Sequence, residues 1–187
     1  LRIVLFPAGR HDLQIFERRY IDMVTESLKS GTPFGICSIE AGTGVRAADT
    51  QHSVNRIGTL ARIIDWNQLD NGLLGITIEG TTKFRVEDCW EADSDLLMAK
   101  VVLSECDTLD SEPMAYGDDF AELVEVLRGL EQHPLVAEKN FAIDYDNLWH
   151  IGWHLSELIP MSEPSRQALL ELDDPRARAE SLMQLLK

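Results

Sequence analysis

Two histidines, His150 and His154, stand four residues apart in a segment of helical periodicity. Imidazoles at positions i and i+4 lie on one face of a helix and can share a zinc ion. No carboxylate lies between them and no cysteine is near them in the sequence, so a metal would lack further ligands. We therefore predict no metal site. We expect the histidines to serve in packing or at a helix end, and Trp149 and Trp153 beside them to anchor a helical core.

Three charged residues, Glu17, Arg19 and Arg85, lie within otherwise apolar segments. A catalytic role would require a nucleophile or an acid–base partner nearby, and the sequence offers none. An unpaired buried charge is costly, so a structural role is the better interpretation. We expect Glu17 to accept hydrogen bonds from backbone N–H groups at a helix start or to pair with an arginine, with Arg85 as a candidate.

The sequence contains no phosphate-binding loop of the type Gly-x-x-x-x-Gly-Lys-Ser/Thr, because Gly42 and Gly44 are followed by Val45-Arg46. ATP hydrolysis is therefore not expected. We predict no catalytic residue and no cofactor, and hence a protein that is not an enzyme.

Two tryptophans occupy positions at which a bound peptide could be anchored. Trp66 stands beside an expected hairpin, and Trp90 follows a strand in an acidic stretch. Aromatic side chains near strand ends can anchor a peptide, although partial burial beneath a loop explains them equally well. We retain both as candidate polypeptide-binding residues.

The charge of the chain is strongly negative and unevenly distributed. The net charge is −15, and residues 1–62 contribute +2 while the remaining residues contribute −17. Between residues 87 and 119 there are eleven acidic side chains and one basic one, Lys100. Such a surface repels phosphate backbones, so nucleic-acid binding is not expected. A solvated acidic face is the simplest interpretation.

Composition sets further limits. An apolar content of 44% indicates a folded protein, and no run approaches the ~18 apolar residues of a membrane span. The three cysteines, Cys37, Cys89 and Cys106, are odd in number and widely spaced. This usage suits a reducing cytoplasm better than a disulfide framework, so we expect a cytoplasmic protein.

The first part of the chain shows the patterns of short strands and one helix. Apolar residues 20, 23, 24 and 28 form a helical stripe that Gly31 should end. Asn71-Gly72 marks a tight hairpin turn, and Gly80 is expected to bend the chain. Residues 41–53 are typical of a loop. We expect strands at residues 3–6, 34–39, 57–66, 73–79, 83–86 and 97–103.

Composition shifts between residues 105 and 117, after which all periodicity is helical. Apolar stripes over residues 120–130 and 148–158 each end shortly before a proline, and Ser162 and Asp174 are good N-caps for two further helices. We therefore expect an α+β fold. Residues 1–112 would form a small, twisted, partly closed β-barrel, and residues 113–187 an α-helical bundle.

Several blocks of this sequence resemble the N-terminal (LON) domain of Lon-type ATP-dependent proteases. The resemblance begins with Leu5-Phe6-Pro7, Leu13, Ile15-Phe16-Glu17 and Arg19-Tyr20, and continues through blocks at residues 34–36, 57–63, 80–86, 158–160 and 166–171. It spans nearly the whole chain. It implies a PUA-like β-rich lobe followed by a helical bundle, which agrees with the pattern above, and a stand-alone relative without the ATPase and peptidase domains.

One block departs from the family pattern. Where relatives usually carry an apolar loop with glycine and proline, this chain has Ala8-Gly9-Arg10-His11-Asp12, and Arg18 replaces a common proline. If the loop binds in relatives, its chemistry differs here. We therefore add Arg10 and His11 to Trp66 and Trp90 as candidate polypeptide-binding residues.

The resemblance implies non-catalytic polypeptide binding, as in substrate recognition by Lon proteases. Sheet edges and the groove between lobes could take an extended chain by strand addition, and an acidic rim would favour basic, partly unfolded polypeptides. A protease or another protein acting in trans is a further expected partner. Two alternatives stay open: a small-molecule-binding PUA-like module, and an adaptor that docks a folded protein.

Overall fold

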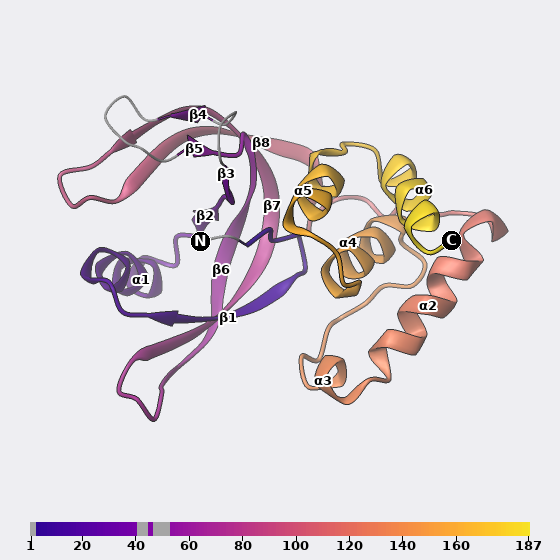
Figure 1. Ribbon diagram of the computed structural model, residues 1–187, viewed down its shortest axis with the longest axis horizontal. Coiled ribbons are helices and arrows are strands. Elements are labelled where there is room, and N and C mark those ends of the chain that lie inside the picture. Colours follow the sequence, from indigo (N-terminus) through magenta and orange to yellow (C-terminus); the bar gives the residue numbers. More distant parts are fainter. Residues whose placement is uncertain (1–2, 41–44, 47–52) are drawn as a thin grey trace.

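A long hairpin of strands β6 (Ile57–Gln68) and β7 (Leu74–Glu91) is the centre of the β-rich part of the molecule. The computed structural model describes residues 3–40, 45–46 and 53–187, and Figure 1 shows the strands gathered in one half and most helices in the other. Asn71-Gly72 closes the hairpin as predicted. Gly72 has a φ of 81°, and the Asn71 side chain accepts a hydrogen bond from the Leu73 N–H at 3.1 Å.

Three further strands complete an antiparallel sheet around this hairpin. Strand β1 (Arg10–Ile15) and strand β8 (Leu97–Thr108) pair with successive parts of β7, and β2 (Phe34–Ile36) pairs with β6. Among the described residues the order is β1-β7-β6-β2, and this sheet does not close into a barrel. A small second sheet contains β3 (Ile39–Glu40), β4 (Val45–Arg46) and β5 (Ser53–Val54). The predicted loop at residues 41–53 thus contains β4 and the first residue of β5; its other residues lie outside the described part of the chain.

The expected first strand is wrong. Residues 3–6 belong to no strand, and β1 instead forms where a loop was expected. Val4 and Phe6 pack into the core of the helices, whereas Leu5 between them packs into the core beside the sheet. Both sides of this segment are therefore buried, because it runs between the two cores. In β1, by contrast, Ile15 is buried while alternate polar side chains are exposed.

At Gly80, where a bend was expected, the register of β6 and β7 shifts, although β7 continues through this residue as one strand. A Cβ atom at Gly80 would lie 2.1 Å from the carbonyl oxygen of Phe6. The glycine is therefore required by the close approach of residues 3–6.

Helix α1 (Arg18–Ser30) packs beside the sheet, with Val24 fully buried. It ends at Gly31 as predicted, since Gly31 has a φ of 71° and its N–H donates to the Ser27 carbonyl at 2.8 Å. We refer to α1 and the strands, from residue 3 to residue 108, as the β lobe.

The helical lobe, residues 118–187, follows a connection in which the expected boundary between residues 112 and 113 falls. Ser162 and Asp174 cap helices as predicted, accepting hydrogen bonds from the N–H groups of Ser165 and Arg176. Trp153 lies in the fully buried core of this lobe. Among the described residues, no helix is long and apolar enough to cross a membrane. The elements of this lobe are η1 (Asp118–Phe120), α2 (Ala121–Glu131), α3 (Pro134–Ala137), α4 (Leu148–Leu158), α5 (Glu163–Glu171) and α6 (Pro175–Leu185).

Candidate functional site

A groove of about 580 Å³ opens on the β lobe between α1 and the hairpin of β7 and β8. Residues from the edge strands β2 and β8 both line it, so it lies at the open side of the sheet. Most of its surface is apolar, and it has the size and character of a ligand-binding site. Its walls are formed mainly by Met23 and Phe34 on one side and by Leu97, Ala99 and Val101 on the other.

A β-bulge shapes the floor of the groove. Phe84 and Val86 point inward from β7 at the usual spacing of two, and Asp88 would continue this series. The register of β7 and β8 shifts between Val86 and Asp88, so Cys89 is the next inward side chain and Asp88 is exposed. Phe84, Val86 and Cys89 form a small buried cluster against which Leu60 and Val101 pack. The bulge therefore keeps the floor apolar.

The Phe84 ring reaches the floor because glycines face it from two neighbouring strands. A Cβ atom at Gly58 would lie 2.7 Å from the Cζ atom of this ring, and one at Gly35 would lie 3.0 Å from it. Larger residues would push the ring into the groove. This explains physically why glycines occur in the blocks at residues 34–36 and 57–63.

The two thiols of the groove are not nucleophilic. Burial, together with the neighbouring Cys89, raises the pKa of Cys37 to about 12. Burial and the adjacent Asp88 also raise the pKa of Cys89. Both thiols therefore stay protonated near neutral pH and act as small apolar side chains. The hydroxyl groups of Ser27 and Ser30 donate to backbone carbonyls, so neither hydroxyl is available as a nucleophile.

Charged residues form a hydrogen bond and an ion pair at one end of the groove and surround its rim. The Arg19 guanidinium donates to the carbonyl of Asp95 at 2.7 Å and thereby ties α1 to the turn between β7 and β8. Glu17 pairs with Arg19 at 2.8 Å, so the expected pairing of Glu17 with an arginine is confirmed. The suggested partner was wrong, because Arg85 points toward Asp173, 4.0 Å away, at the helical lobe. Acidic side chains at residues 87, 88, 91, 93 and 95 are exposed around this hairpin.

The four predicted binding residues do not form one site. Trp90 lies opposite Met98, a residue of the groove, and its side chain is 47% exposed. Trp66 is 60% exposed but pairs with Ile76, toward the other end of β7, at the opposite hairpin in Figure 1. The structure thus brings only Trp90 close to the groove.

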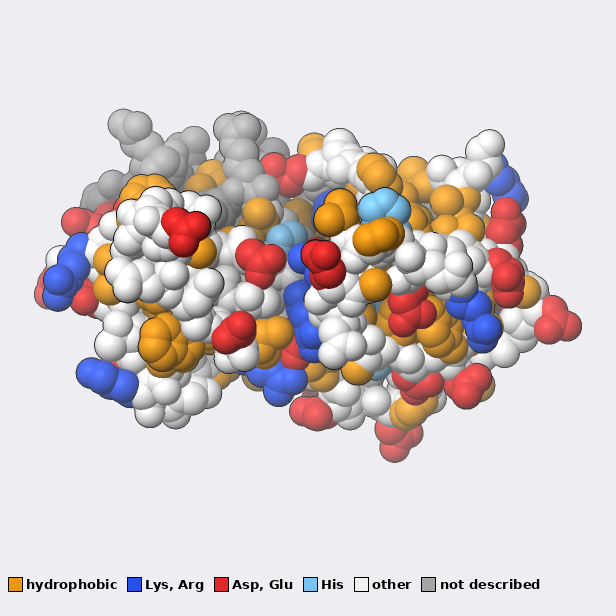
Figure 2. All heavy atoms as spheres, turned by 90° about the horizontal axis from the view of Figure 1, so that it is seen from below, with side chains coloured by type: hydrophobic (Ala, Val, Ile, Leu, Met, Phe, Trp, Pro, Cys, Tyr) orange, Lys and Arg blue, Asp and Glu red, His pale blue; other side chains and the backbone are white. Residues whose placement is uncertain are grey.

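Arg10 and His11 lie on β1, where it meets the helical lobe. Arg10 bonds Glu79 at 2.7 Å and the carbonyl of Lys139 at 2.8 Å, and His11 pairs with Glu157 of α4 at 2.5 Å. Figure 2 shows Lys and Arg side chains gathered along the boundary of the lobes on this face. Burial alone would raise the pKa of Glu79, but hydrogen bonds from Arg62 and Arg10 outweigh it and lower this pKa. Arg10 and His11 are thus engaged in contacts between the lobes.

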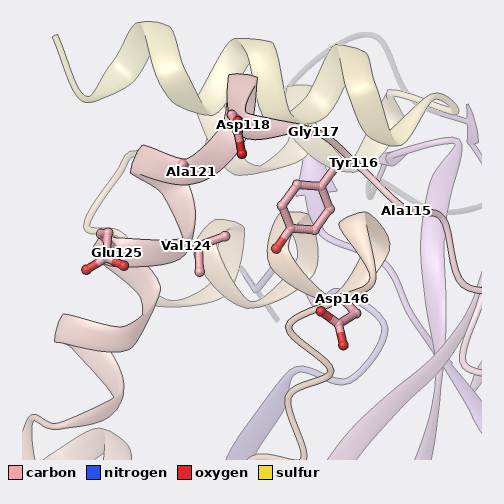
Figure 3. A pocket seen from close by; sticks show the side chains of 8 residues that line it. All are labelled: Ala115, Tyr116, Gly117, Asp118, Ala121, Val124, Glu125 and Asp146. Atoms are coloured by element: carbon pink, nitrogen blue, oxygen red, sulfur yellow. The ribbon is translucent and has the colours of Figure 1, made fainter.

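A second hollow, of about 340 Å³, lies in the helical lobe. Figure 3 shows the carboxylates of Asp118, Glu125 and Asp146 spread around it without converging on a point. The Tyr116 hydroxyl donates to the carbonyl of Tyr145 and is therefore already engaged. Among the described residues, no group of three or more His, Cys, Asp or Glu side chains could hold a metal ion. This hollow offers little with which to orient a ligand.

Of the two histidines, His154 lies in the helical core, whereas His150 is half-buried and its Nδ1 accepts a hydrogen bond from the Asp144 N–H at 3.2 Å. His154 is almost completely buried, and neither ring nitrogen has a hydrogen-bond partner among the residues that the structure describes. Burial, with smaller effects of His150 and Arg10, lowers the pKa of His154 to about 3. The two imidazole centroids are 5.9 Å apart, and Trp149 and Trp153 are buried beside them, as expected.

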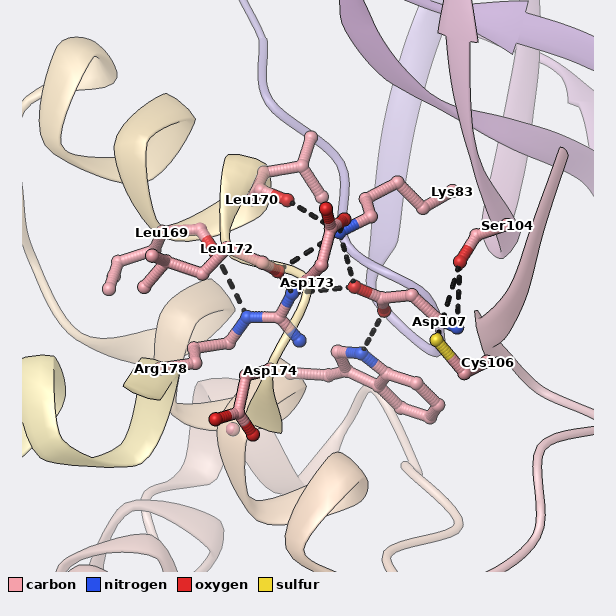
Figure 4. Close-up of polar contacts among 12 residues, drawn as sticks. Lys83, Ser104, Cys106, Asp107, Leu169, Leu170, Leu172, Asp173, Asp174 and Arg178 are labelled. Carbon is pink, nitrogen blue, oxygen red and sulfur yellow. Dashed lines mark hydrogen bonds and ion pairs between the residues drawn. The ribbon is translucent and has the colours of Figure 1, made fainter. Parts of the chain in front are cut away.

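A buried polar cluster between the lobes was not anticipated from the sequence (Figure 4). Asp107 at the end of β8 accepts hydrogen bonds from Arg178 of α6 at 2.6 Å and from the indole of Trp153 at 2.7 Å. Lys83 of β7 lies 2.9 Å from Asp107 and 2.7 Å from Asp173. The hydrogen bond from Lys83 is the main reason that the pKa of Asp173 is lowered. The cluster fixes the groove-bearing hairpin to the helices.

Comparisons with known proteins give a consistent result. The family model of the ATP-dependent protease La (LON) substrate-binding domain matches residues 1–187. The crystal structure of a Lon N-terminal domain protein from Xanthomonas campestris is 31% identical, with a TM-score of 0.75 over 98% of this chain and 94% of that one. The N-terminal domain of Lon protease from the Mycobacterium avium complex shares the fold at 14% identity, with a TM-score of 0.60 over 97% and 91% of the chains. A comparison with curated protein sequences gives no match.

Proposed function

This chain belongs to the family of LON substrate-binding domains, and on that premise we propose that it binds polypeptide segments in the groove between α1, β2 and β8. The observation that carries the proposal is the apolar groove itself, open along the edge strand β8 and about 580 Å³ in volume. Apolar side chains that folding normally buries are available in an unfolded chain. The groove would therefore select unfolded segments over folded proteins.

We further propose that binding proceeds without a chemical reaction. The thiols that line the groove are protonated, and the hydroxyls of Ser27 and Ser30 are engaged with backbone carbonyls. Within the described residues, the groove pairs no nucleophile with a base. The groove would recognise a polypeptide through apolar contacts on its floor and charged residues at its rim.

The shape of the groove favours a second candidate, the binding of an apolar small molecule. Its volume lies within the range of ligand pockets, and Phe84, Val86 and Leu60 would supply apolar contact. Fewer polar groups converge on the groove than a specific small ligand would require, so we place this function second. A small apolar compound that displaces bound polypeptide would indicate that the two ligands share the groove.

Lysozyme provides a direct test, because its folded and unfolded forms have the same sequence. Lysozyme unfolded by reduction and capped with iodoacetamide keeps its basic charge, and native lysozyme serves as the control. Fluorescence anisotropy of the labelled proteins should show saturable binding of the unfolded form and at least about tenfold weaker binding of the native form. Equal binding of both forms, or binding of neither, would overturn the proposal.

A further inference from the structure

We propose that the free edge of β8 binds an extended, lysine- or arginine-rich segment of the polypeptide as an added β-strand. This inference rests on the proposed polypeptide binding and specifies which backbone edge and which client chemistry it uses. Within the described part of the chain, β8 pairs with β7 and with no other strand. Its outer N–H and C=O groups therefore form a template on which another strand can pair.

The composition of β8 leaves this edge unprotected. Edge strands are commonly shielded by charged residues, by proline or by being short. Strand β8 is twelve residues long, and residues 97–103 contain no proline and one charged residue, Lys100. Val102 is 52% exposed and Leu103 is 49% exposed. Such exposure of large apolar side chains on an open edge is typical of an interaction site.

An added strand would find apolar surface on both of its faces. Leu97, Ala99 and Val101 line the groove, so alternate side chains of the incoming segment would enter it. The other face of β8 carries Val102, and at the rim of the groove Met98, which also lines it, pairs with Trp90 of β7. The remaining side chains of the segment would contact this second surface. Strand addition thus joins the groove and Trp90 into one continuous site.

The negative charge around β8 indicates which kind of polypeptide segment would bind there. Exposed acidic residues flank the strand on the hairpin and at its far end, at positions 87, 88, 91, 93, 95 and 105. The base in this stretch, Lys100, already pairs with Glu87 at 2.8 Å. A segment with lysine or arginine between its apolar residues would complement these carboxylates. A second copy of this chain would bring the same acidic residues against one another, so charge disfavours self-association through β8.

The test uses a fluorescein-labelled ten-residue peptide that alternates lysine and valine. The control peptides carry glutamate in place of lysine, or N-methyl groups on the four central amides. N-methylation removes backbone donors on both edges of the peptide and keeps its side chains. We expect each change to weaken binding at least about tenfold. Hydrogen exchange should also show slower exchange of the β8 amides when the lysine–valine peptide is bound.

Protein variants test the charge requirement separately. Glu91→Lys with Glu105→Lys should weaken binding of the lysine–valine peptide at least about tenfold. Glu122→Lys with Glu180→Lys, an equal charge change at exposed positions of the helical lobe, should leave it unchanged. Circular dichroism would verify that both double variants fold.

The outcomes separate the two proposals. If unfolded lysozyme binds but N-methylation has no effect and the β8 amides are not protected, strand addition is wrong while groove binding stands. If neither unfolded lysozyme nor any peptide binds, the proposed function itself fails. Sedimentation that shows a dimer, with β8 amides protected in the absence of peptide, would make a second copy the occupant and overturn the inference.

Discussion

Arg178 of α6 donates to Asp107 of β8 at 2.6 Å, although the two residues are 71 positions apart and both side chains are fully buried. The carboxylate also accepts from Trp153 and lies beside Lys83, and the Arg178 guanidinium donates to the carbonyls of Leu169 and Leu172. Charges removed from water are tolerated only when they are paired and hydrogen-bonded. The two lobes are therefore held together by a cluster whose members depend on one another.

Replacing Arg178 with methionine should destabilise the protein by about 3–5 kcal/mol, because Asp107 would lose a buried cationic partner. Urea denaturation followed by tryptophan fluorescence would measure this change. Arg18→Met provides the control, since Arg18 forms an exposed pair with Asp22 within one helix. An unfolding midpoint for Arg178→Met equal to that of Arg18→Met would contradict the assigned role of the cluster.

The buried histidine predicts a specific dependence of stability on pH. His154 has a pKa of about 3 in the folded protein, against 6.5 for an unperturbed histidine. Above pH 6.5 both states are neutral, and His154 contributes no dependence. As the pH falls from 6.5 toward 3, the unfolded state binds the proton, so stability should decrease by up to about 1.4 kcal/mol per pH unit.

His154→Leu should remove this contribution, since leucine has a similar volume and no titration. As the pH falls from 7 to 4.5, the original protein should lose free energy of unfolding relative to the His154→Leu variant. His133→Leu is a suitable control, because His133 is exposed. Parallel pH profiles for His154→Leu and the original protein would show that His154 is not held neutral.

Gly80 should not tolerate a side chain, because a Cβ atom there would meet the Phe6 carbonyl oxygen at 2.1 Å. The approaching atom belongs to the backbone, so relief would require residues 3–6 to move out of the two cores. Gly80→Ala is expected to cost more than about 2 kcal/mol in thermal or urea unfolding. Gly129→Ala, with open space around its Cβ position in α2, should be neutral or stabilising by up to about 1 kcal/mol. Equal stabilities for the two variants would refute this packing.

The two exposed tryptophans should differ in their contribution to binding. Trp90 lies beside the groove, whereas Trp66 lies at the opposite hairpin. We expect Trp90→Ala to weaken the binding of unfolded lysozyme at least about fivefold and Trp66→Ala to leave it unchanged. Anisotropy titrations of both variants measure the difference. A larger effect at Trp66 would place the binding surface elsewhere on the sheet.

Local signals in the sequence predicted much of the fold. Gly31, Ser162 and Asp174 mark helix ends in the structure, and Asn71-Gly72 closes the central hairpin, because each acts through the backbone of its own neighbours. The α+β architecture and the separation of strands from helices followed from the change in periodicity.

Features that depend on distant residues were missed. The alternation in residues 3–6 resembles a strand, but its cause is burial between two cores that only the assembled fold creates. The close approach of Phe6 to Gly80 has no local signal, because the two residues are remote in sequence. The groove depends on a bulge near Asp88, for which the one local signal is an apolar Cys89 where a polar residue would continue the alternation. Lys83, Asp107 and Arg178 carry no local indication that they meet.

The central claim is that the groove of the β lobe binds unfolded polypeptide. We would test it with Leu97→Ser combined with Met98→Ser, two partly exposed residues that line the groove. The matched control is Leu135→Ser with Leu185→Ser, two exposed leucines of the helical lobe. In anisotropy titrations with unfolded lysozyme, the groove variant should bind at least about tenfold more weakly and the control variant like the original protein. Unchanged binding by the groove variant, or an equal loss in both variants, would contradict the claim.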